Sequence, residues 1–233
     1  MTSNVKKVYK NSFSFDVIDD KIFHQPVGYD FWGQYSSWET NTFNIFDKFL
    51  KKDKCFLDIG AWVGATSIYA AQLCDKIYCI EPDPVAFNFL QQNLSLNNIT
   101  NAKVYNNALT YERGVFLSEV DFFGSSMSRC SHDSGSLLVS GLKLEDIIFD
   151  EKFSLIKMDI EGYESICLPN MVSTLREIKV PIYISFHQSF FPNKEKSVQE
   201  LINLLNFYEH IVDDSFCEID YNNLNGFGSY LFF

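Results

Sequence analysis

Acidic residues gather directly after one apolar run of the sequence. In the stretch LIKMDIEGYE, the run LIKM is followed by Asp159, Glu161, Gly162 and Glu164. Carboxylates can accept protons, orient hydroxyl groups and coordinate metal ions. If the run is a strand of a parallel sheet, its carboxyl end lies at the edge where such sheets bind ligands. We therefore expect Asp159 and Glu161 to face a ligand and not the core.

A glycine-rich turn in the stretch DIGAWVGATS forms a second candidate site. Its glycines allow a ligand to approach the backbone closely. The pattern is Asp-x-Gly-x-x-x-Gly, with Asp58, Gly60 and Gly64. A dinucleotide fingerprint counted from Gly60 would need glycine where Trp62 and Ala65 stand, and no Gly-Lys-Ser/Thr follows for a P-loop. The spacing therefore predicts a ligand without a pyrophosphate.

The next predicted strand ends in a carboxylate. Glu81 follows the run KIYCI, where an acid can accept hydrogen bonds from two ribose hydroxyls. Asn107 and Ala108, at the end of a third strand, would lie beside an adenine ring. An adenosine ligand without phosphates points to S-adenosylmethionine, and Asp58 could interact with its cationic methionine part.

Alternating strand and helix patterns must position these residues. We expect strands over 54–60, 76–81, 102–109, 153–161 and 181–187, and helices over 41–52, 65–74, 84–98, 165–177 and 197–210. The tail supplies two more strands, 211–219 and 228–233, joined by an Asn/Gly turn. Residues 1–40 and 111–145 read as irregular, with strand-like pieces at 115–120 and 126–130. This alternation predicts an α/β fold with a mostly parallel, seven-stranded sheet, helices on both faces and a C-terminal antiparallel hairpin.

The length of 233 residues fits a single domain over 1–233. We expect residues 41–233 to form the cofactor-binding core and residues 1–40 to form an N-terminal lid or substrate-side extension. The irregular stretch 121–136 is the expected acceptor loop, and the aromatic cluster from Tyr35 to Trp38 could wall the pocket.

The charge and the distribution of apolar residues exclude some classes of partner. The net charge of −11 argues against nucleic acid, whose phosphates would repel an acidic surface. The N-terminus lacks a signal peptide's apolar stretch, and no apolar run is long enough to span a membrane. None of the six cysteines forms a CxxC pair. We expect a reducing, cytoplasmic location.

The stretches FLDIGAWVGATSIYAA, CIEPDP and LIKMDIEGYE together resemble the FkbM family of S-adenosylmethionine-dependent methyltransferases. The K-x-D-x-E-G-x-E signature at 157–164 is the specific part, whereas the glycine turn indicates only the broad class I methyltransferase fold. The matching stretches lie within residues 38–187. The family usually carries Asn where this chain has Trp62.

This resemblance implies a Rossmann-like class I fold and O-methylation of a hydroxyl on a sugar or glycan. The alternative acceptor is a polyketide or other small-molecule hydroxyl. It also implies S-adenosyl-L-methionine as cofactor, bound by residues at the matching positions: Glu39, Asp58, Gly60, Ala61, Gly64, Glu81, Pro82, Asp83, Asn107, Ala108 and Asp159.

Two residues are candidate bases for such a transfer. An alcohol is a poor nucleophile while it is protonated, so a nearby base helps. His187 ends the strand next to that of Asp159, and its unperturbed pKa of about 6.5 is nearest neutrality. We expect His187 to accept the proton and Asp159 to orient the acceptor or the imidazole.

The same residues could hold a divalent metal such as Mg or Mn. Asp159, Glu161 and His187 form a plausible ligand set, and a bound cation would acidify a sugar hydroxyl. The competing interpretation is that Glu161 and Glu164 cap the helix that follows.

Other classes of protein fit the sequence less well. A non-catalytic methyltransferase-fold binding subunit would not need Gly60, Glu81, Asp159 and His187 intact. The broken glycine fingerprint disfavours an NAD-dependent oxidoreductase. Acidity, and the lack of an Asn/Asp-Pro-Pro-Tyr motif after the fourth strand, disfavour RNA methylation.

Overall fold

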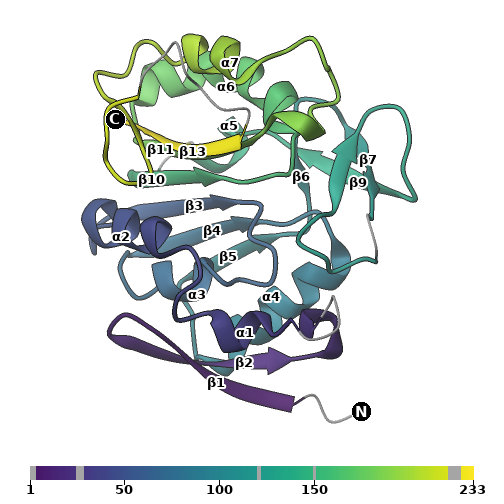
Figure 1. Cartoon of the computed structure of the whole chain (residues 1–233), viewed down its shortest axis with the longest axis vertical. Helices are drawn as coiled ribbons and strands as arrows, with labels where there is room; N and C mark the ends of the chain where they lie inside the picture. The colour runs from purple at the N-terminus through teal and green to yellow at the C-terminus, as the bar shows by residue number, and fades with distance from the viewer. Residues whose placement is uncertain (1–3, 25–28, 120–121, 149–150, 220–226) are drawn as a thin grey trace.

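A seven-stranded sheet forms the centre of the molecule in the computed structural model (Figure 1), which describes residues 4–24, 29–119, 122–148, 151–219 and 227–233. The strand order is β12-β13-β11-β10-β3-β4-β5. The strands are β3 (Cys55–Ile59), β4 (Lys76–Ile80), β5 (Ala102–Tyr105), β10 (Phe153–Met158), β11 (Ile182–His187), β12 (Ile211–Asp213) and β13 (Phe227–Phe232). Strands β5, β4, β3, β10 and β11 are parallel, and β13 is antiparallel to β11 and β12. The predicted sheet and C-terminal antiparallel pair are confirmed; the predicted Asn/Gly turn lies outside the described residues.

Alternating side chains of the strands bury both faces of this sheet. In β3, Leu57 and Ile59 pack in one hydrophobic cluster, whereas Phe56 packs in the other. The first cluster contains residues of α5 (Glu145–Ile148), α6 (Glu164–Ile178) and α7 (Val198–Leu204). The second contains residues of α2 (Thr40–Phe49), α3 (Ser67–Ala70) and α4 (Pro84–Leu96). Helices therefore cover both faces, as predicted, although α3 and α7 are shorter than expected.

Residues 4–24 and 29–40 contain regular structure, so the prediction that the N-terminal region is irregular was wrong for these residues. Strands β1 (Asn4–Lys10) and β2 (Phe13–Asp19) form an antiparallel hairpin, followed by a 3-10 turn η1 (Lys21–His24) and α1 (Phe31–Gln34). The hairpin lies beside α1 and α4 in Figure 1. Asn93 of α4 accepts a hydrogen bond from the Ile18 backbone N–H, with a distance of 2.8 Å between the two atoms. The sequence pattern did not predict the hairpin, because contacts with the distant helix α4 stabilise it.

A second, four-stranded sheet takes three of its strands from the region 111–145, which we expected to be irregular. It has the order β6-β9-β7-β8, with β6 (Ala108–Leu109), β7 (Gly114–Ser118), β8 (Arg129–Ser131) and β9 (Leu137–Leu142). The predicted single strand over 102–109 is therefore wrong: β5 ends at Tyr105, and Ala108 belongs to the second sheet.

The described residues contain no helix that is both long and apolar enough to cross a membrane. All six cysteines are free thiols. The cytoplasmic location stays a prediction.

Candidate active site

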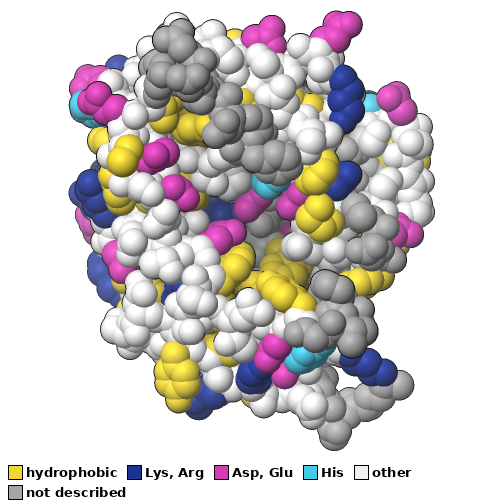
Figure 2. All heavy atoms as spheres, in the orientation of Figure 1, with side chains coloured by type: hydrophobic (Ala, Val, Ile, Leu, Met, Phe, Trp, Pro, Cys, Tyr) yellow, Lys and Arg dark blue, Asp and Glu magenta, His cyan; other side chains and the backbone are white. Residues whose placement is uncertain are grey.

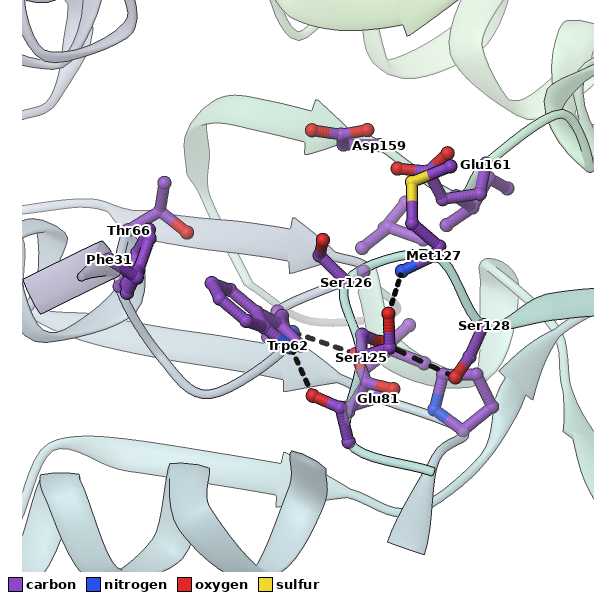
Figure 3. A pocket seen from close by; sticks show the side chains of 18 of the residues that line it. Phe31, Trp62, Thr66, Glu81, Ser125, Ser126, Met127, Ser128, Asp159 and Glu161 are labelled. Carbon is purple, nitrogen blue, oxygen red and sulfur yellow. Dashed lines mark hydrogen bonds between the residues drawn. The ribbon is translucent and has the colours of Figure 1, made fainter. Parts of the chain in front are cut away.

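One cavity of about 1010 Å³ lies at the carboxyl ends of β3, β4, β10 and β11. Figure 2 shows a hollow on this face with acidic and hydrophobic side chains at its margin. The loop 122–128 and residues within 20–23 and 29–39 supply the other walls. The cavity is lined by these predicted residues: Glu39, Gly60, Ala61, Glu81, Pro82, Ala108, Asp159, Glu161 and His187. Figure 3 places Glu81 at one end and Asp159 and Glu161 at the other. We call them the Glu81 end and the His187 end, because His187 lies next to both of these acids.

The glycine turn forms the floor of the cavity. The backbone N–H groups of Gly60 and Ala61 both donate to the carbonyl oxygen of Ile80, each at 3.0 Å. Gly60 has a φ of +83°, and a Cβ there would lie 1.9 Å from the Asp159 carbonyl oxygen. Only glycine fits this position, because both the dihedral and the space exclude a side chain. The turn thus brings the ends of β3, β4 and β10 together.

Glu81 is fixed by two backbone donors. Its Oε2 accepts from the Trp62 N–H at 2.7 Å, and its Oε1 accepts from the Asp83 N–H at 2.8 Å. Burial raises the pKa of Glu81 to about 8, although these two hydrogen bonds oppose the shift. Each carboxylate oxygen can accept a further hydrogen bond, so this side chain can receive hydroxyl donors from a ligand in the cavity.

Trp62 is a residue whose role the sequence did not predict. It has a φ of +48°, in the left-handed region where Asn is tolerated and a bulky side chain is unusual. Its ring packs edge-to-face on Phe23 and Phe31, with centroid distances of 6.0 and 4.7 Å. Its Nε1 donates to the Gly124 carbonyl oxygen at 2.8 Å. The indole therefore links the loop 122–128 to the N-terminal wall.

Four predicted cofactor residues lie outside the cavity lining among the described residues: Asp58, Gly64, Asp83 and Asn107. Asp83 caps α4 by accepting from the Val85 and Ala86 N–H groups, while its other oxygen accepts from Gly124 N–H and the Ser128 hydroxyl. The Asn107 amide donates to the Ser140 carbonyl oxygen at 3.3 Å. A Cβ on Gly64, with φ +86°, would lie 2.8 Å from Leu90 Cδ1. These residues shape the site from behind.

Lys157 is a second residue that the sequence analysis did not single out, although it begins the acidic signature. Its Nζ lies 3.8 Å from Asp58 Oδ1 and 3.5 Å from Asp159 Oδ2. Burial alone would lower the pKa of Lys157, but Asp159, Asp58 and Glu39 raise it above its usual value. A charged residue inside the apolar run of β10 was the available signal. Three acids around one ammonium leave a local negative charge that favours a cationic ligand.

Three carboxylates surround His187 at the other end. Its Nδ1 lies 3.9 Å from Asp159 Oδ1 and 3.6 Å from Glu164 Oε1, and its Nε2 lies 4.0 Å from Glu161 Oε1. Burial alone would lower the pKa of His187, but these acids raise it to about 9. Burial raises the pKa of Glu161 to about 7. Asp159 and Glu161 therefore face both the cavity and the imidazole, whereas Glu164 contacts the imidazole from behind the cavity lining.

The conformation of the turn after β10 explains why a glycine stands at position 162. Glu161 and Gly162 have φ values of +53° and +99°, and a Cβ on Gly162 would lie 2.5 Å from the Phe190 carbonyl carbon. Glu164 is fully buried, and its Oε1 accepts from the Ile160 N–H at 3.0 Å. The N-cap of α6 is Tyr163, without a side-chain cap. Glu161 lies outside α6, but Glu164 is the first residue of the helix, where an acid suits the positive end of the helix dipole. The capping interpretation therefore holds for Glu164 and not for Glu161.

The parallel order β5-β4-β3-β10-β11, completed by antiparallel β13 and by β12, defines a class I methyltransferase together with the glycine turn and Glu81. A family model described as the methyltransferase FkbM domain matches residues 58–214, more than half of the chain. The chain therefore belongs to the FkbM family of methyltransferases.

Two curated relatives match parts of the chain. An uncharacterized protein of Methanocaldococcus jannaschii is 20% identical over 167 residues, covering 71% of this chain and 60% of the relative. The ribosomal protein L11 methyltransferase of Clostridium perfringens is 27% identical over 129 residues, covering 51% and 40%. The chain thus spans less than two-thirds of the length of these relatives.

Solved methyltransferases share the fold. FkbM from Methylobacillus flagellatus superposes with a TM-score of 0.50 at 19% identity, covering 77% of this chain and 43% of that one. A 16S rRNA methyltransferase of T. thermophilus, solved with AdoMet and guanosine, gives a TM-score of 0.54 at 11% identity and covers 98% and 50%.

Proposed function

We propose that the protein transfers a methyl group from S-adenosylmethionine to a hydroxyl of a sugar or glycan. One observation carries this proposal: Glu81 lines one end of the cavity and Asp159 and Glu161 line the other (Figure 3), where His187 also lines it. A volume of about 1010 Å³ is large enough for two ligands, since single ligand sites commonly occupy about 300–1,000 Å³.

The Glu81 end fits an adenosine. Glu81 can accept the ribose hydroxyls, and Ala108, Leu109 and Cys130 offer small and apolar surface for the base. Glu39 and Lys157 line the cavity beside Asp159, and the negative balance of this group suits the sulfonium and ammonium groups of the methionine part.

The His187 end fits the acceptor hydroxyl. When bound, S-adenosylmethionine supplies a methyl carbon activated by its sulfonium. His187 would take the proton of the acceptor hydroxyl as the methyl group is transferred. Asp159, Glu161 and Glu164 stabilise the resulting imidazolium. They also favour a protonated His187 before the reaction, so the imidazole must lose that proton for each turnover.

The walls at the mouth favour a sugar over an extended polyketide. Phe31 and Trp38 provide aromatic faces on one side, and the loop 122–128 adds serine hydroxyls on the other. Sugars pack on aromatic faces and exchange hydrogen bonds with hydroxyls. A polyketide or other small-molecule hydroxyl remains the alternative acceptor.

Ribosomal RNA and ribosomal protein are acceptors suggested by the names of similar methyltransferases. The net charge of −11 and the acids of this cavity disfavour a phosphate backbone. We therefore rank these acceptors below a sugar.

A divalent metal is a further candidate for the His187 end. Donor atoms of Asp159, Glu161 and His187 all lie within 4.8 Å of one another. Glu161 Oε2 and Glu164 Oε2 are buried and accept no hydrogen bond from the described residues, so the cluster has spare oxygen donors. A bound cation would polarise an acceptor hydroxyl. Thermal stabilisation of the wild type by Mg²⁺ or Mn²⁺, absent in Asp159→Asn, would support the site; no stabilisation of the wild type would exclude it.

Methyl transfer from labelled S-adenosylmethionine tests the function. We expect product with rhamnosides, fucosides or nucleotide sugars, in reactions run with and without a chelator. Cofactor binding without turnover on sugars, small-molecule hydroxyls, RNA or protein would favour a non-catalytic binding subunit. No binding of S-adenosylmethionine would overturn the proposal.

A further inference from the structure

The N-terminal hairpin contains a buried lysine. Lys10 ends β1 and is only 1% exposed. Its Nζ donates to three backbone carbonyl oxygens, those of Tyr35 at 3.3 Å, Ser36 at 3.2 Å and Trp38 at 2.5 Å. The ammonium also lies 4.2 Å from the centroid of the Phe43 ring. A buried ammonium is costly unless its donors are satisfied, so this arrangement is specific.

The three carbonyls belong to the turn that delivers two cavity residues. The turn follows α1 and leads into α2, and both Trp38 and Glu39 line the cavity. Glu39 adopts a left-handed conformation with φ +44° and ψ +46°. Such a conformation in a non-glycine residue costs free energy, and it persists where neighbouring contacts fix it. Lys10 is one such contact.

The Glu39 carboxylate is held in place from the other side as well. Its Oε2 accepts from the Thr42 hydroxyl at 3.1 Å, and Thr42 in turn contacts the Tyr183 hydroxyl at 3.1 Å. Burial raises the pKa of Glu39, and Lys157 opposes that shift. Glu39 thus belongs to the same group of charges as Lys157 and Asp159.

We propose that Lys10 is a positioning residue for the cofactor, because its ammonium fixes the turn that presents Glu39 and Trp38 to the methionine part. This inference rests on the proposed binding of S-adenosylmethionine. It makes the hairpin an integral part of the site, although it lies outside the residues 58–214 that the family model matches.

The hairpin offers a matched control. Lys7 is on the same strand, but its side chain is 52% exposed and pairs with Asp16, with a distance of 2.8 Å between Nζ and Oδ1. Lys7→Met removes an ammonium from β1 without touching the turn. Lys10→Met keeps a long unbranched side chain while removing all three donated hydrogen bonds.

The experiment compares two ligands by calorimetry on the full chain. S-adenosylmethionine has the methionine part, whereas methylthioadenosine keeps the nucleoside and lacks the amino-acid end. We expect Lys10→Met to weaken S-adenosylmethionine binding about tenfold or more, and to change methylthioadenosine binding by less than about twofold. Lys7→Met should match the wild type for both ligands.

A double-mutant cycle adds a readout that general destabilisation would not give. Glu39→Gln should weaken S-adenosylmethionine binding in the wild type and have little further effect in Lys10→Met. If Lys10→Met does not fold, Lys10→Arg takes its place, because a planar guanidinium cannot reproduce the three contacts.

Two results would overturn the inference: unchanged S-adenosylmethionine affinity in a folded Lys10 variant, or equal loss of both ligands. If the wild type itself fails to bind S-adenosylmethionine, the proposed function fails instead, so the two failures are distinguishable.

Discussion

At the Glu81 end of the cavity, one acid receives two backbone N–H groups, whereas at the His187 end three acids share one imidazole. The first arrangement is satisfied within the protein and has a fixed shape. The second leaves buried oxygens of Glu161 and Glu164 without hydrogen bonds from the described residues. This contrast supports the proposed function, in which the fixed Glu81 end binds the cofactor and the charged His187 end accepts the proton of the acceptor hydroxyl.

Removing the imidazole should produce the largest effect. We expect His187→Ala to lower turnover by about 10²- to 10⁴-fold, the usual contribution of a general base, with S-adenosylmethionine affinity nearly unchanged. Single-turnover assays and calorimetry measure the two quantities. His210→Ala, an exposed histidine that packs on Phe233, is the control. Turnover within about tenfold of the wild type would remove His187 as the essential base.

Truncating Glu81, at the Glu81 end, should weaken the binding of S-adenosylmethionine. Glu81→Ala loses charged acceptors for the ribose hydroxyls, at a cost of about 2 kcal/mol or about 30-fold in Kd. Methylthioadenosine should weaken to the same extent. Glu161→Gln, at the His187 end, should leave both affinities unchanged. Equal binding losses in the two variants would mean that the ends are not separate.

The pH dependence of S-adenosylmethionine binding tests the assignment of Glu81 to the cofactor. Donation from ribose hydroxyls favours the ionised carboxylate, so binding lowers the pKa of Glu81 from its value of about 8 in the free protein. Affinity should be constant above pH 8 and fall by up to about tenfold per pH unit below it, because a proton must then be released. Calorimetry between pH 6 and 9 measures this, and Glu81→Gln should give a flat profile. A flat wild-type profile would contradict the assignment of Glu81.

The smallest effect concerns a residue behind the Glu81 end. Asp83→Ala removes the N-cap of α4 and the tie to Gly124, so we expect the free energy of unfolding to fall by about 1–2 kcal/mol. Urea denaturation measures this. The exposed Asp53→Ala should stay within about 0.5 kcal/mol of the wild type. A larger loss of nucleoside affinity in Asp83→Ala than in Glu81→Ala would place Asp83 in direct contact with the ligand.

The parts of the site that could be predicted are those encoded locally. The strand, glycine turn and helix around Gly60 form one contiguous pattern, and Glu81 follows its own strand directly. Parallel pairing then brings such ends together whatever the rest of the chain does. The same logic placed Asp159 and His187 on neighbouring strands, and the structure pairs β10 with β11.

The remaining features depend on contacts between distant segments. Lys10 is an ordinary surface residue by composition, and it is buried because the turn after α1 wraps over it. Asn107 seemed to end a strand, but β5 stops earlier and the second sheet takes up Ala108. Trp62 was known only as a departure from the family pattern; its contacts with Phe23 and Gly124 join segments that no local pattern connects.

Gly162 and Phe190 pack backbone to backbone and form one corner beside the cavity, since a Cβ on Gly162 would lie 2.5 Å from the Phe190 carbonyl carbon. The turn that holds Glu161 therefore rests directly on the segment that follows His187. Changes of acceptor during divergence would therefore spare this corner and fall on the opposite wall. Loop exchanges over 122–128 between related proteins would be the economical way to retarget the enzyme while its proton-handling group stays intact.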